Sequence, residues 1–353
     1  MWGPFYAKEI MDTIQIANIL LTRRCNLRCD YCSIVRDYSD IPKEYPKMKH
    51  YTNSELEPSE WIRILSKLKL NNPDVFIIFY GGEPFLYPGL TELIKYCHSE
   101  NINYTIISNN TPAIQLKVID LFNDVGPIHG FTASIDPNLA RYWGQGLENR
   151  TDIDHSIIKT FEGFRNLKEL KDYGIAEDVV AEITVMPDNV KWLYDTVKIL
   201  SEAGIYSSIT TIDMKKSPYY DFSTVDDESL KIPKDDRVAA EFFKILADKS
   251  LLVHIPELLL DLYNVLPWEM MCEIYKDLHN VTIDADGNFR LCLRIRGIHT
   301  PTVKLDNIFN SDGTIAPFFK SSLKKDYTDH CKGCNWTCMA MSAHFADKIK
   351  EHI

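Results

Sequence analysis

A cysteine-rich stretch near the start of the chain decides its interpretation, because residues 24–33 read RCNLRCDYCS. Cys25, Cys29 and Cys32 have the spacing CxxxCxxC and come directly after the apolar run 14–21, which predicts a strand. Three thiolates cannot complete the four-thiolate shell of a cubane iron-sulfur cluster, so one iron would stay open for another ligand. The spacing therefore indicates a cluster with an exchangeable site.

Structural zinc is the alternative for these cysteines. Zinc sites usually draw four ligands in two pairs, and no further Cys or His follows this loop before His50. The pattern therefore favours an iron-sulfur cluster over zinc.

Composition limits the class of protein. The 353 residues suffice for two or three domains, and a hydrophobic share of 45% supplies a sizeable core. A net charge of −11 argues against nucleic acid as a partner, and neither a signal peptide nor a membrane span is evident. We therefore expect a cytoplasmic protein whose nine cysteines serve metal or redox chemistry rather than disulfides.

Hydrophobic periodicity predicts strands alternating with helices over the first two thirds of the chain. The predicted strands are 14–21, 75–80, 104–108, 130–135, 179–186 and 205–212. The predicted helices between them are 59–70, 90–99, 113–122, 156–171 and 190–203. Six such units, with strands that are mostly apolar throughout, indicate an α/β fold with a partial (β/α)6 barrel similar to a TIM barrel.

The remaining residues predict a different organisation. We expect the barrel to occupy residues 1–214, a linker with bridging helices near 238–248 and 256–264 to occupy 215–266, and a small separate domain to occupy 267–353. Within that last part, residues 281–292 alternate, turn at Asp286-Gly287 and alternate again, which predicts a β-hairpin that ends at Cys292.

Polar motifs follow three of the predicted strands. These are Gly81-Gly82-Glu83-Pro84, Ser108-Asn109-Asn110 and Ser134-Ile135-Asp136-Pro137. The glycines allow a close approach to the backbone, and the carboxylate can accept hydrogen bonds from an ammonium group. Strand C-termini are where barrel enzymes assemble their sites, although Asn110 or Asp136 could instead cap the next helix.

The CxxxCxxC loop, with the aromatic Tyr31 before its third cysteine and a Gly-Gly-Glu motif one unit later, resembles the radical S-adenosylmethionine (SAM) enzymes. The resemblance implies a [4Fe-4S] cluster on Cys25, Cys29 and Cys32, with SAM chelated at the open iron and cleaved to a 5′-deoxyadenosyl radical. It further implies that SAM is bound by Tyr31, Gly81, Gly82, Glu83, Pro84, Ser108, Asn109, Ser134, Asp136 and Arg150.

The resemblance implies roles for single residues, and the chain departs from the family pattern at two positions. Glu83 is expected to hold the methionyl amine of SAM, and Ser134 with a later arginine is expected to meet its ribose or carboxylate. Arg150 is preferred to Arg141 because it precedes the next helix. Asn110 and Pro137 replace the glycines usual in the family.

A second set of cysteines lies near the C-terminus, and Cys97 stands apart from both sets. The set resembles the SPASM/Twitch extension of radical SAM enzymes, and its five cysteines fit the Twitch form with one auxiliary [4Fe-4S] cluster. The proposed ligands are Cys272, Cys292, Cys331 and Cys334. Cys338 could replace one of the last two ligands, and zinc is the alternative metal. Cys97 reads as a buried small hydrophobe.

The sequence thus predicts a radical SAM oxidoreductase or maturase that abstracts a hydrogen atom from a small molecule or peptide and gives a net oxidation. Its electrons would come from a flavodoxin- or ferredoxin-like reductant. One alternative is a redox-neutral epimerase in which Cys338 is the catalytic hydrogen-atom donor. The other is a zinc-stabilised binding protein without catalysis.

Overall fold

The computed structural model describes residues 13–27, 29, 55–136, 138–143, 145, 155–211, 232, 235–254, 259, 280–287, 289–290 and 308–315. One sheet runs through this part of the chain, in the order β6-β5-β4-β3-β2-β1-β7-β8. Its first six strands are β1 (Ile16–Thr22), β2 (Phe76–Gly81), β3 (Asn103–Ser108), β4 (Ile128–Ile135), β5 (Ala176–Val185) and β6 (Tyr206–Thr211). They are all parallel to their neighbours.

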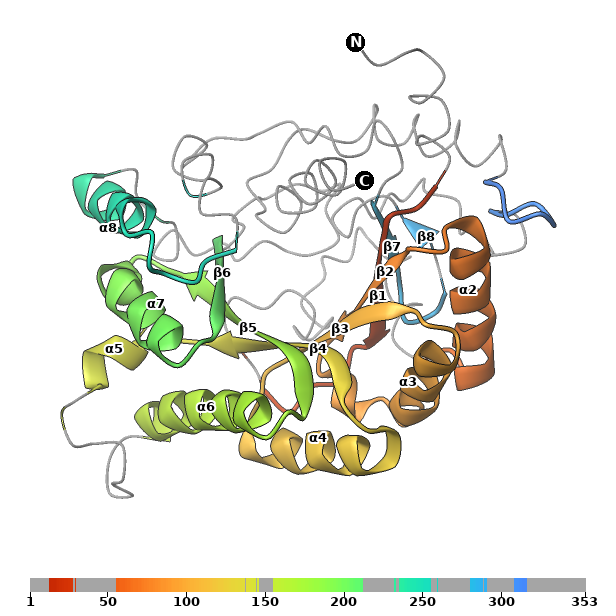
Figure 1. Cartoon of the computed structure of the whole chain (residues 1–353), viewed down its shortest axis with the longest axis horizontal. Coiled ribbons are helices and arrows are strands. Elements are labelled where there is room, and N and C mark those ends of the chain that lie inside the picture. Colours follow the sequence, from red (N-terminus) through yellow and green to blue (C-terminus); the bar gives the residue numbers. More distant parts are fainter. Residues whose placement is uncertain are drawn as a thin grey trace, which may run out of the picture.

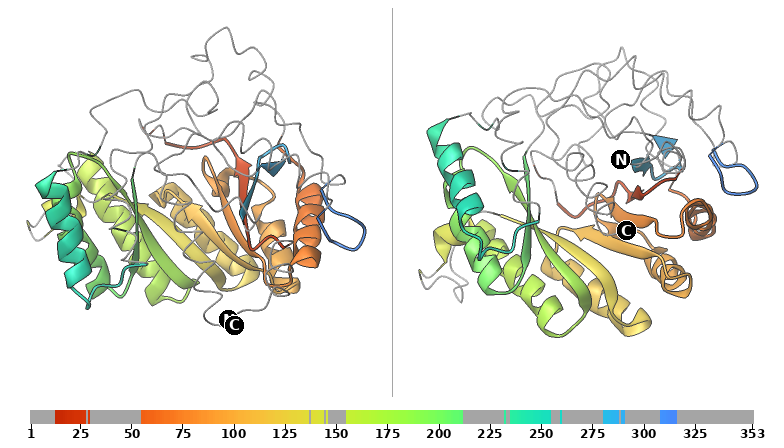
Figure 2. Two further views of the ribbon diagram at one scale, coloured as in Figure 1. Left: turned by 90° about the horizontal axis from the view of Figure 1, so that it is seen from above. Right: turned by 45° about the horizontal axis from the view of Figure 1, so that its top comes forward.

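Helices connect consecutive strands and lie on the outer side of the curved sheet (Figure 1). They are α2 (Pro58–Asn71), α3 (Leu90–Ser99), α4 (Pro112–Val125), α5 (Leu139–Tyr142), α6 (His155–Asp172), α7 (Leu193–Glu202) and α8 (Asp236–Ala247). Two 3-10 turns, η3 (Pro84–Leu86) and η4 (Val190–Trp192), precede α3 and α7. Figure 2 shows the same arrangement from two further directions. On its far side from β5, β6 pairs in the described residues through an isolated parallel bridge of Ser207 with Val253 and with no further strand, so the sheet ends there.

The core lies between the sheet and this outer layer of helices. In β5, Val179, Ala181, Ile183 and Val185 are all at most 5% exposed and belong to one apolar cluster with residues of α6 and α7. Because alternate side chains of a strand point to opposite faces, Glu182 lies on the other face. We call the face away from the helices the inner face.

The partial (β/α)6 barrel is confirmed. Each of the six predicted strands and of the five helices between them occurs within three residues of its predicted ends. Helix 238–248 is confirmed as α8, whereas helix 256–264 lies outside the described residues apart from Leu259.

The predicted hairpin is also confirmed, as β7 (Asn280–Ile283) antiparallel to β8 (Phe289–Arg290). Gly287, at φ 80°, takes the left-handed conformation in its turn. The sequence did not indicate that β7 pairs in parallel with β1 and so extends the barrel sheet itself. The domain boundary at residue 267 stays a prediction, since most of 255–353 lies outside the described residues.

Candidate functional site

The cysteine loop begins where β1 ends. Cys25 and Cys29 are both partly exposed, whereas Tyr31 and Cys32 lie outside the described residues. The Cys25 sulfur accepts a hydrogen bond from the Leu27 amide at 3.4 Å and one from the Asn109 side chain at 3.7 Å. The first predicted cluster ligand therefore lies next to the end of β3.

Two asparagines join the loop to β3 and α4. The Asn109 Nδ2 group donates to Asn26 Oδ1 at 2.7 Å, and Asn26 Nδ2 donates to Thr111 Oγ1 at 2.9 Å. Asn109 was predicted to contact SAM. Its side-chain Nδ2 group contacts the cysteine loop, so it also helps to position Cys25.

The two glycines after β2 permit a backbone approach to this same loop. The Gly82 amide donates to Thr22 O at 2.7 Å and the Glu83 amide donates to Arg24 O at 2.8 Å. A Cβ atom on Gly82 would come within 2.7 Å of the Arg23 carbonyl oxygen and closer still to that of Arg24. No larger side chain fits there without moving the backbone that leads into the cysteines.

Glu83 is fully buried and bridges β2 to β3. Its Oε1 accepts hydrogen bonds from Ser108 Oγ at 3.0 Å and from the Phe85 amide at 3.3 Å, and its Oε2 accepts one from the Asn109 amide at 2.9 Å. Burial raises the pKa of Glu83 to about 7, although these three bonds favour the charged form. Pro84 opens η3 beside it and is buried. Contact between the Glu83 carboxylate and SAM stays a prediction.

Asn110 takes the place of a glycine by adopting a glycine-like backbone. Its φ of 49° is left-handed, a conformation that Asn tolerates better than most residues. Its side chain donates to Gly163 O at 2.9 Å rather than capping α4, whose N-cap is Thr111. The substitution therefore preserves the bend after β3 and anchors it to α6.

The motif after β4 is less enclosed. Ser134 is exposed near the end of the strand, and Asp136 Oδ1 accepts hydrogen bonds from the backbone and side chain of Asn138, at 2.9 and 3.0 Å. The Asp136 side chain thus stabilises the turn into α5, but the N-cap of that helix is Asn138 and not Asp136. Pro137 and Arg150 lie outside the described residues, and Arg141 lies over the ring of Tyr142.

The sequence interpretation missed two arginines directly before Cys25. Arg24 forms a bidentate pair with Glu55, with Nε–Oε1 at 3.0 Å and Nη2–Oε2 at 2.6 Å, and Thr22 Oγ1 donates to the same carboxylate. Arg23 pairs at 3.5 Å with Asp284, whose side chain is 2% exposed and follows β7. The available signal was the adjacent Arg23-Arg24 pair itself.

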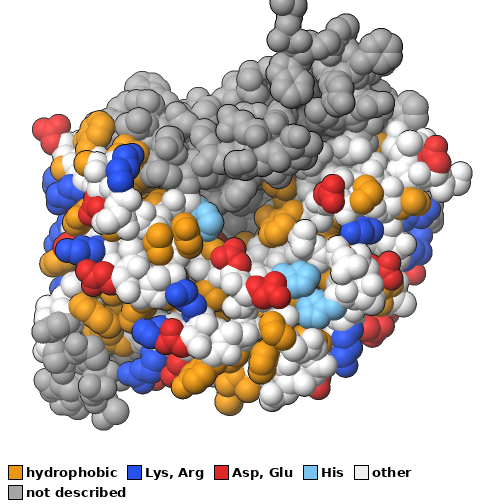
Figure 3. All heavy atoms as spheres, in the orientation of Figure 1, with side chains coloured by type: hydrophobic (Ala, Val, Ile, Leu, Met, Phe, Trp, Pro, Cys, Tyr) orange, Lys and Arg blue, Asp and Glu red, His pale blue; other side chains and the backbone are white. Residues whose placement is uncertain are grey.

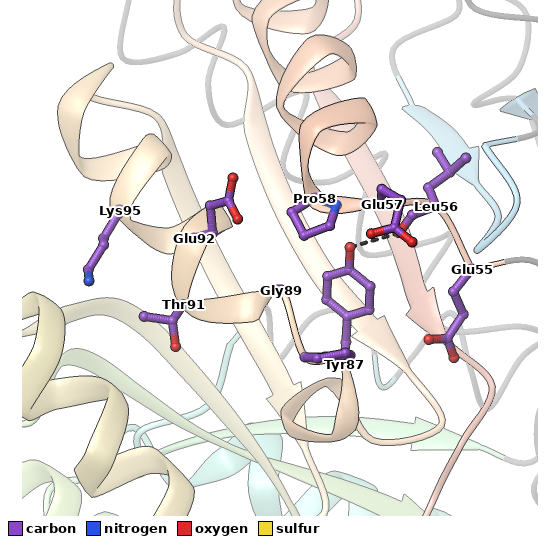
Figure 4. A pocket seen from close by; sticks show the side chains of 10 residues that line it. Glu55, Leu56, Glu57, Pro58, Tyr87, Gly89, Thr91, Glu92 and Lys95 are labelled. Carbon is purple, nitrogen blue, oxygen red and sulfur yellow. Dashed lines mark hydrogen bonds between the residues drawn. The ribbon is translucent and has the colours of Figure 1, made fainter.

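A cavity of about 490 Å3 lies between the starts of α2 and α3 (Figure 4). Glu55, Glu57 and Glu92 line it together with Tyr87, whose hydroxyl donates to Leu56 O at 2.8 Å. Burial and these carboxylates raise the pKa of Tyr87. Glu55 therefore belongs both to this cavity and to the contacts that hold the cysteine loop.

The inner face of β4–β6 carries a polar row, of which the sequence analysis singled out only Ser134. Ser134, Glu182 and Ser208 are direct neighbours in the sheet register. Burial raises the pKa of Glu182 to about 7, and no hydrogen bond from the described residues offsets this shift. A run of mostly apolar residues around Glu182 concealed it in the sequence.

Several of the predicted site residues lie outside the described part of the chain. Cys272, Cys292, Cys331, Cys334 and Cys338 all lie outside them. Within the described ranges, no group of three metal-ligating side chains occurs and no helix is long and apolar enough to cross a membrane. The visible described surface mixes acidic and basic side chains without a continuous basic patch (Figure 3). Cys97 is fully buried, as predicted, and burial raises its pKa to about 12.

Comparison with known proteins identifies the family. The model of the radical SAM superfamily matches residues 19–200, from β1 to α7, which is more than half of the chain. The chain therefore belongs to the radical SAM superfamily. Membership implies a SAM-binding [4Fe-4S] cluster and SAM as cofactors.

Named relatives carry diverse activities. The chain is 26% identical over 231 residues to the radical SAM cyclopropyl synthase TigE of Paramaledivibacter caminithermalis, covering 62% of this chain and 45% of that protein. It is 25% identical over 122 residues to an S-adenosylmethionine-dependent nucleotide dehydratase of Selenomonas ruminantium, covering 34% and 39%. The chain thus spans less than half of the length of these curated relatives.

Solved structures share the fold. The structure of Streptococcus suis SuiB bound to its precursor peptide SuiA matches with a TM-score of 0.55 at 15% identity, covering 85% of this chain and 64% of that one. At this level of identity the likeness extends to the fold alone.

Proposed function

We propose that this chain binds a [4Fe-4S] cluster through Cys25, Cys29 and Cys32, and that it binds SAM at the C-terminal ends of β1–β4. When bound, such a cluster supplies the electron that splits SAM into methionine and a 5′-deoxyadenosyl radical, which takes a hydrogen atom from the substrate. The observation that carries the proposal is the convergence of Cys25, Asn109 and the Gly81-Gly82 backbone at adjoining strand ends.

The described cysteines and their surroundings fit an iron-sulfur cluster. Cys25 and Cys29 are partly exposed, as ligands of an accessible cluster must be. Two hydrogen bonds already reach the Cys25 sulfur, and bonds to sulfur tune the potential of a cluster. Asn109 and Asn26 hold the loop against β3, so the ligand geometry is supported before a metal arrives.

The remaining predicted SAM ligands have distinct proposed roles. Exposed Ser134 and the neighbouring Asp136 would meet the ribose of SAM, with Arg150 opposite its carboxylate. The methionyl amine would lie at the loop of Gly82, Glu83 and Pro84. Since Glu83 bridges two strands, its contribution includes holding this loop in place.

We further propose an auxiliary [4Fe-4S] cluster on Cys272, Cys292, Cys331 and Cys334, with Cys338 as the alternative ligand. An electron acceptor near the substrate would suit a net oxidation of a small molecule or peptide, with a flavodoxin- or ferredoxin-like reductant. Support comes from the hairpin that leads towards Cys292, because β7 joins β1 directly. Relatives named as a cyclopropyl synthase and a nucleotide dehydratase leave both substrate classes open.

Anaerobic reconstitution with iron and sulfide tests this function. The wild-type chain should hold about eight irons, because two cubane clusters are proposed. Replacing Cys25, Cys29 and Cys32 together with Ala should leave about half of that iron and abolish formation of 5′-deoxyadenosine. Cys97→Ala is the matched control, since buried Cys97 should be dispensable for both. Tightly held zinc without iron would reject the proposal.

A further inference from the structure

A partly buried carboxylate without a described partner lies beside the proposed SAM site. Glu182 is on the inner face of β5, since its neighbours Ala181 and Ile183 pack fully buried on the side of the helices. Its cross-strand neighbours are Ser134, proposed to meet SAM, and Ser208. The side chain therefore faces the same space as the proposed SAM site.

Charge in this region is unbalanced. None of the strands β1–β6 contains a Lys or Arg residue. Ion pairs in the described part of the chain hold the carboxylates of Glu55 and Asp284, but none reaches Glu182. A carboxylate withdrawn from water without a partner is unfavourable, and a cation brought next to it removes that penalty.

We infer that Glu182 is a substrate-recognition residue that binds a cationic group of the substrate, an ammonium or a guanidinium. The inference rests on the proposed function, because it requires the substrate to lie over β5 next to SAM. Burial without hydrogen bonds accounts for the raised pKa of Glu182, about 7, and an adjacent cation would lower it again. Uncharged substrate groups would leave the carboxylate unpaired.

Pairs of near-isosteric probes test the charge requirement. N-acetyl-arginine amide is compared with N-acetyl-citrulline amide, and N-acetyl-lysine amide with N-acetyl-norleucine amide, on the reconstituted enzyme with SAM and without reductant. NMR titration should show tighter binding of at least one cationic probe by about ten- to a hundredfold. Equal binding within both pairs would overturn the inference.

Three variants separate recognition from other effects. Glu182→Gln should abolish the preference for the cation, and Glu182→Asp should retain part of it. Glu177→Gln removes a charge from an exposed position of the same strand and should keep the full preference. A preference that survives in Glu182→Gln would show that another group binds the cation and would overturn the assignment.

SAM binding is measured in parallel by calorimetry. Glu177→Gln should leave the dissociation constant of SAM and the slow formation of 5′-deoxyadenosine without substrate unchanged, and Glu182→Gln is compared with it. A weakened SAM affinity with an intact probe preference would place Glu182 at the cofactor and overturn the inference. Failure of the wild-type chain to bind SAM at all would instead reject the proposed function.

Discussion

The two halves of the sheet, β1–β3 and β4–β6, differ in how their polar groups are hydrogen-bonded. At the ends of β1–β3, the Gly82 and Glu83 amides bond to the backbone before the cysteines, and Glu83 accepts three hydrogen bonds. On the inner face of β4–β6, Glu182 receives none from the described residues. Glu83 is fully buried and Glu182 is partly buried, and burial raises the pKa of both to about 7.

The difference in hydrogen bonding indicates which part of the sheet holds a fixed geometry and which part can bind a ligand. Polar groups that already have partners hold a geometry in place and need no reorganisation when a ligand arrives. A buried polar group without a partner carries a cost that a complementary ligand can remove. The β1–β3 half is therefore suited to hold a cofactor in one position, and the β4–β6 half is suited to recognise a variable substrate.

Gly82→Ala, in the β1–β3 half, should have the largest effect on stability. The added Cβ would overlap the Arg23 and Arg24 carbonyl oxygens, which belong to backbone and cannot rotate away. We expect a loss of about 3 kcal/mol or more in the free energy of unfolding, together with reduced cluster loading, since the displaced segment leads into Cys25. Urea unfolding and iron analysis measure the two quantities.

Gly163→Ala is the matched control for that substitution. Gly163 lies within α6, and a Cβ there would meet only Ile135 at 3.7 Å. Alanine should be neutral or stabilise the helix by up to about 1 kcal/mol. Similar losses in both variants would show that the approach of β2 to the cysteine loop has no special role.

Loss of the charge should have opposite effects on stability at Glu83 and at Glu182. Glu83→Gln should cost about 1.5–3 kcal/mol at pH 8, because an amide cannot accept all three hydrogen bonds and turns a donor towards one of the facing donors. Glu182→Gln should instead stabilise the chain at that pH by about 1–2 kcal/mol, since it removes an unpaired charge. Unfolding in urea at several pH values measures both.

The effect of Glu182 on stability should depend on pH. A pKa raised from 4.5 to about 7 on folding means that the folded chain holds this proton more tightly. The carboxyl is therefore without penalty below pH 4.5, and stability falls as pH rises to about 7. The gain from Glu182→Gln should grow over this window and vanish near pH 4.5. A gain that is constant with pH would contradict an electrostatic origin.

The described strands and helices of the barrel could be predicted almost completely because each has its own local pattern. Apolar runs such as 75–80 and amphipathic stretches such as 90–99 need no distant information. The pairing of β7 with β1 could not be predicted, because it depends on residues more than 250 positions apart and leaves no periodic signal.

Part of the candidate site could also be predicted from local motifs, and part could not. The cysteines, Gly81-Gly82 and Asn109 could be found because motif residues lie at strand ends. The partners of Arg23 and Arg24 are Asp284 and Glu55, which come from other segments, and only the folded chain brings them together. Glu182 was missed because one acid in an apolar strand gives no pattern.

Asp284→Asn should have an intermediate effect on stability, through its contact with Arg23 at the end of β1. Asp284 is almost completely buried and pairs with Arg23, whose side chain is 13% exposed, so the amide would leave a cation poorly paired. We expect a loss of about 1–2 kcal/mol in the free energy of unfolding, below the full cost of a close buried pair because the N–O distance is 3.5 Å.

Asp172→Asn is its control. Asp172 pairs with Lys168 on the exposed surface of α6, where ion pairs contribute less than about 0.5 kcal/mol. Equal losses would mean that the link between β7 and the cysteine loop contributes no more than a surface pair.

The smallest effect concerns the boundary between the halves, at the N-terminal ends of β3 and β4. His98 Nε2 bonds to the Tyr104 hydroxyl at 2.9 Å, and its ring stacks on His129 with centroids 4.9 Å apart. Burial, and then the neighbouring His129, lower the pKa of His98, while Glu177 opposes this shift. Folding therefore favours the neutral ring.

Because the pKa of His98 is lower in the folded chain, its contribution is complete above its usual pKa of 6.5 and is lost as pH falls below that value. His98→Gln can keep a polar partner for Tyr104 but does not titrate in this window. We expect the wild-type chain to lose up to about 1 kcal/mol more stability than the variant between pH 7 and pH 5. Parallel pH profiles of the two chains, measured by urea unfolding, would show that this stacked pair does not sense protons. In that case the acid sensitivity of the chain would have to arise from its carboxylates, and the pH profile of Glu182→Gln would test one of them directly.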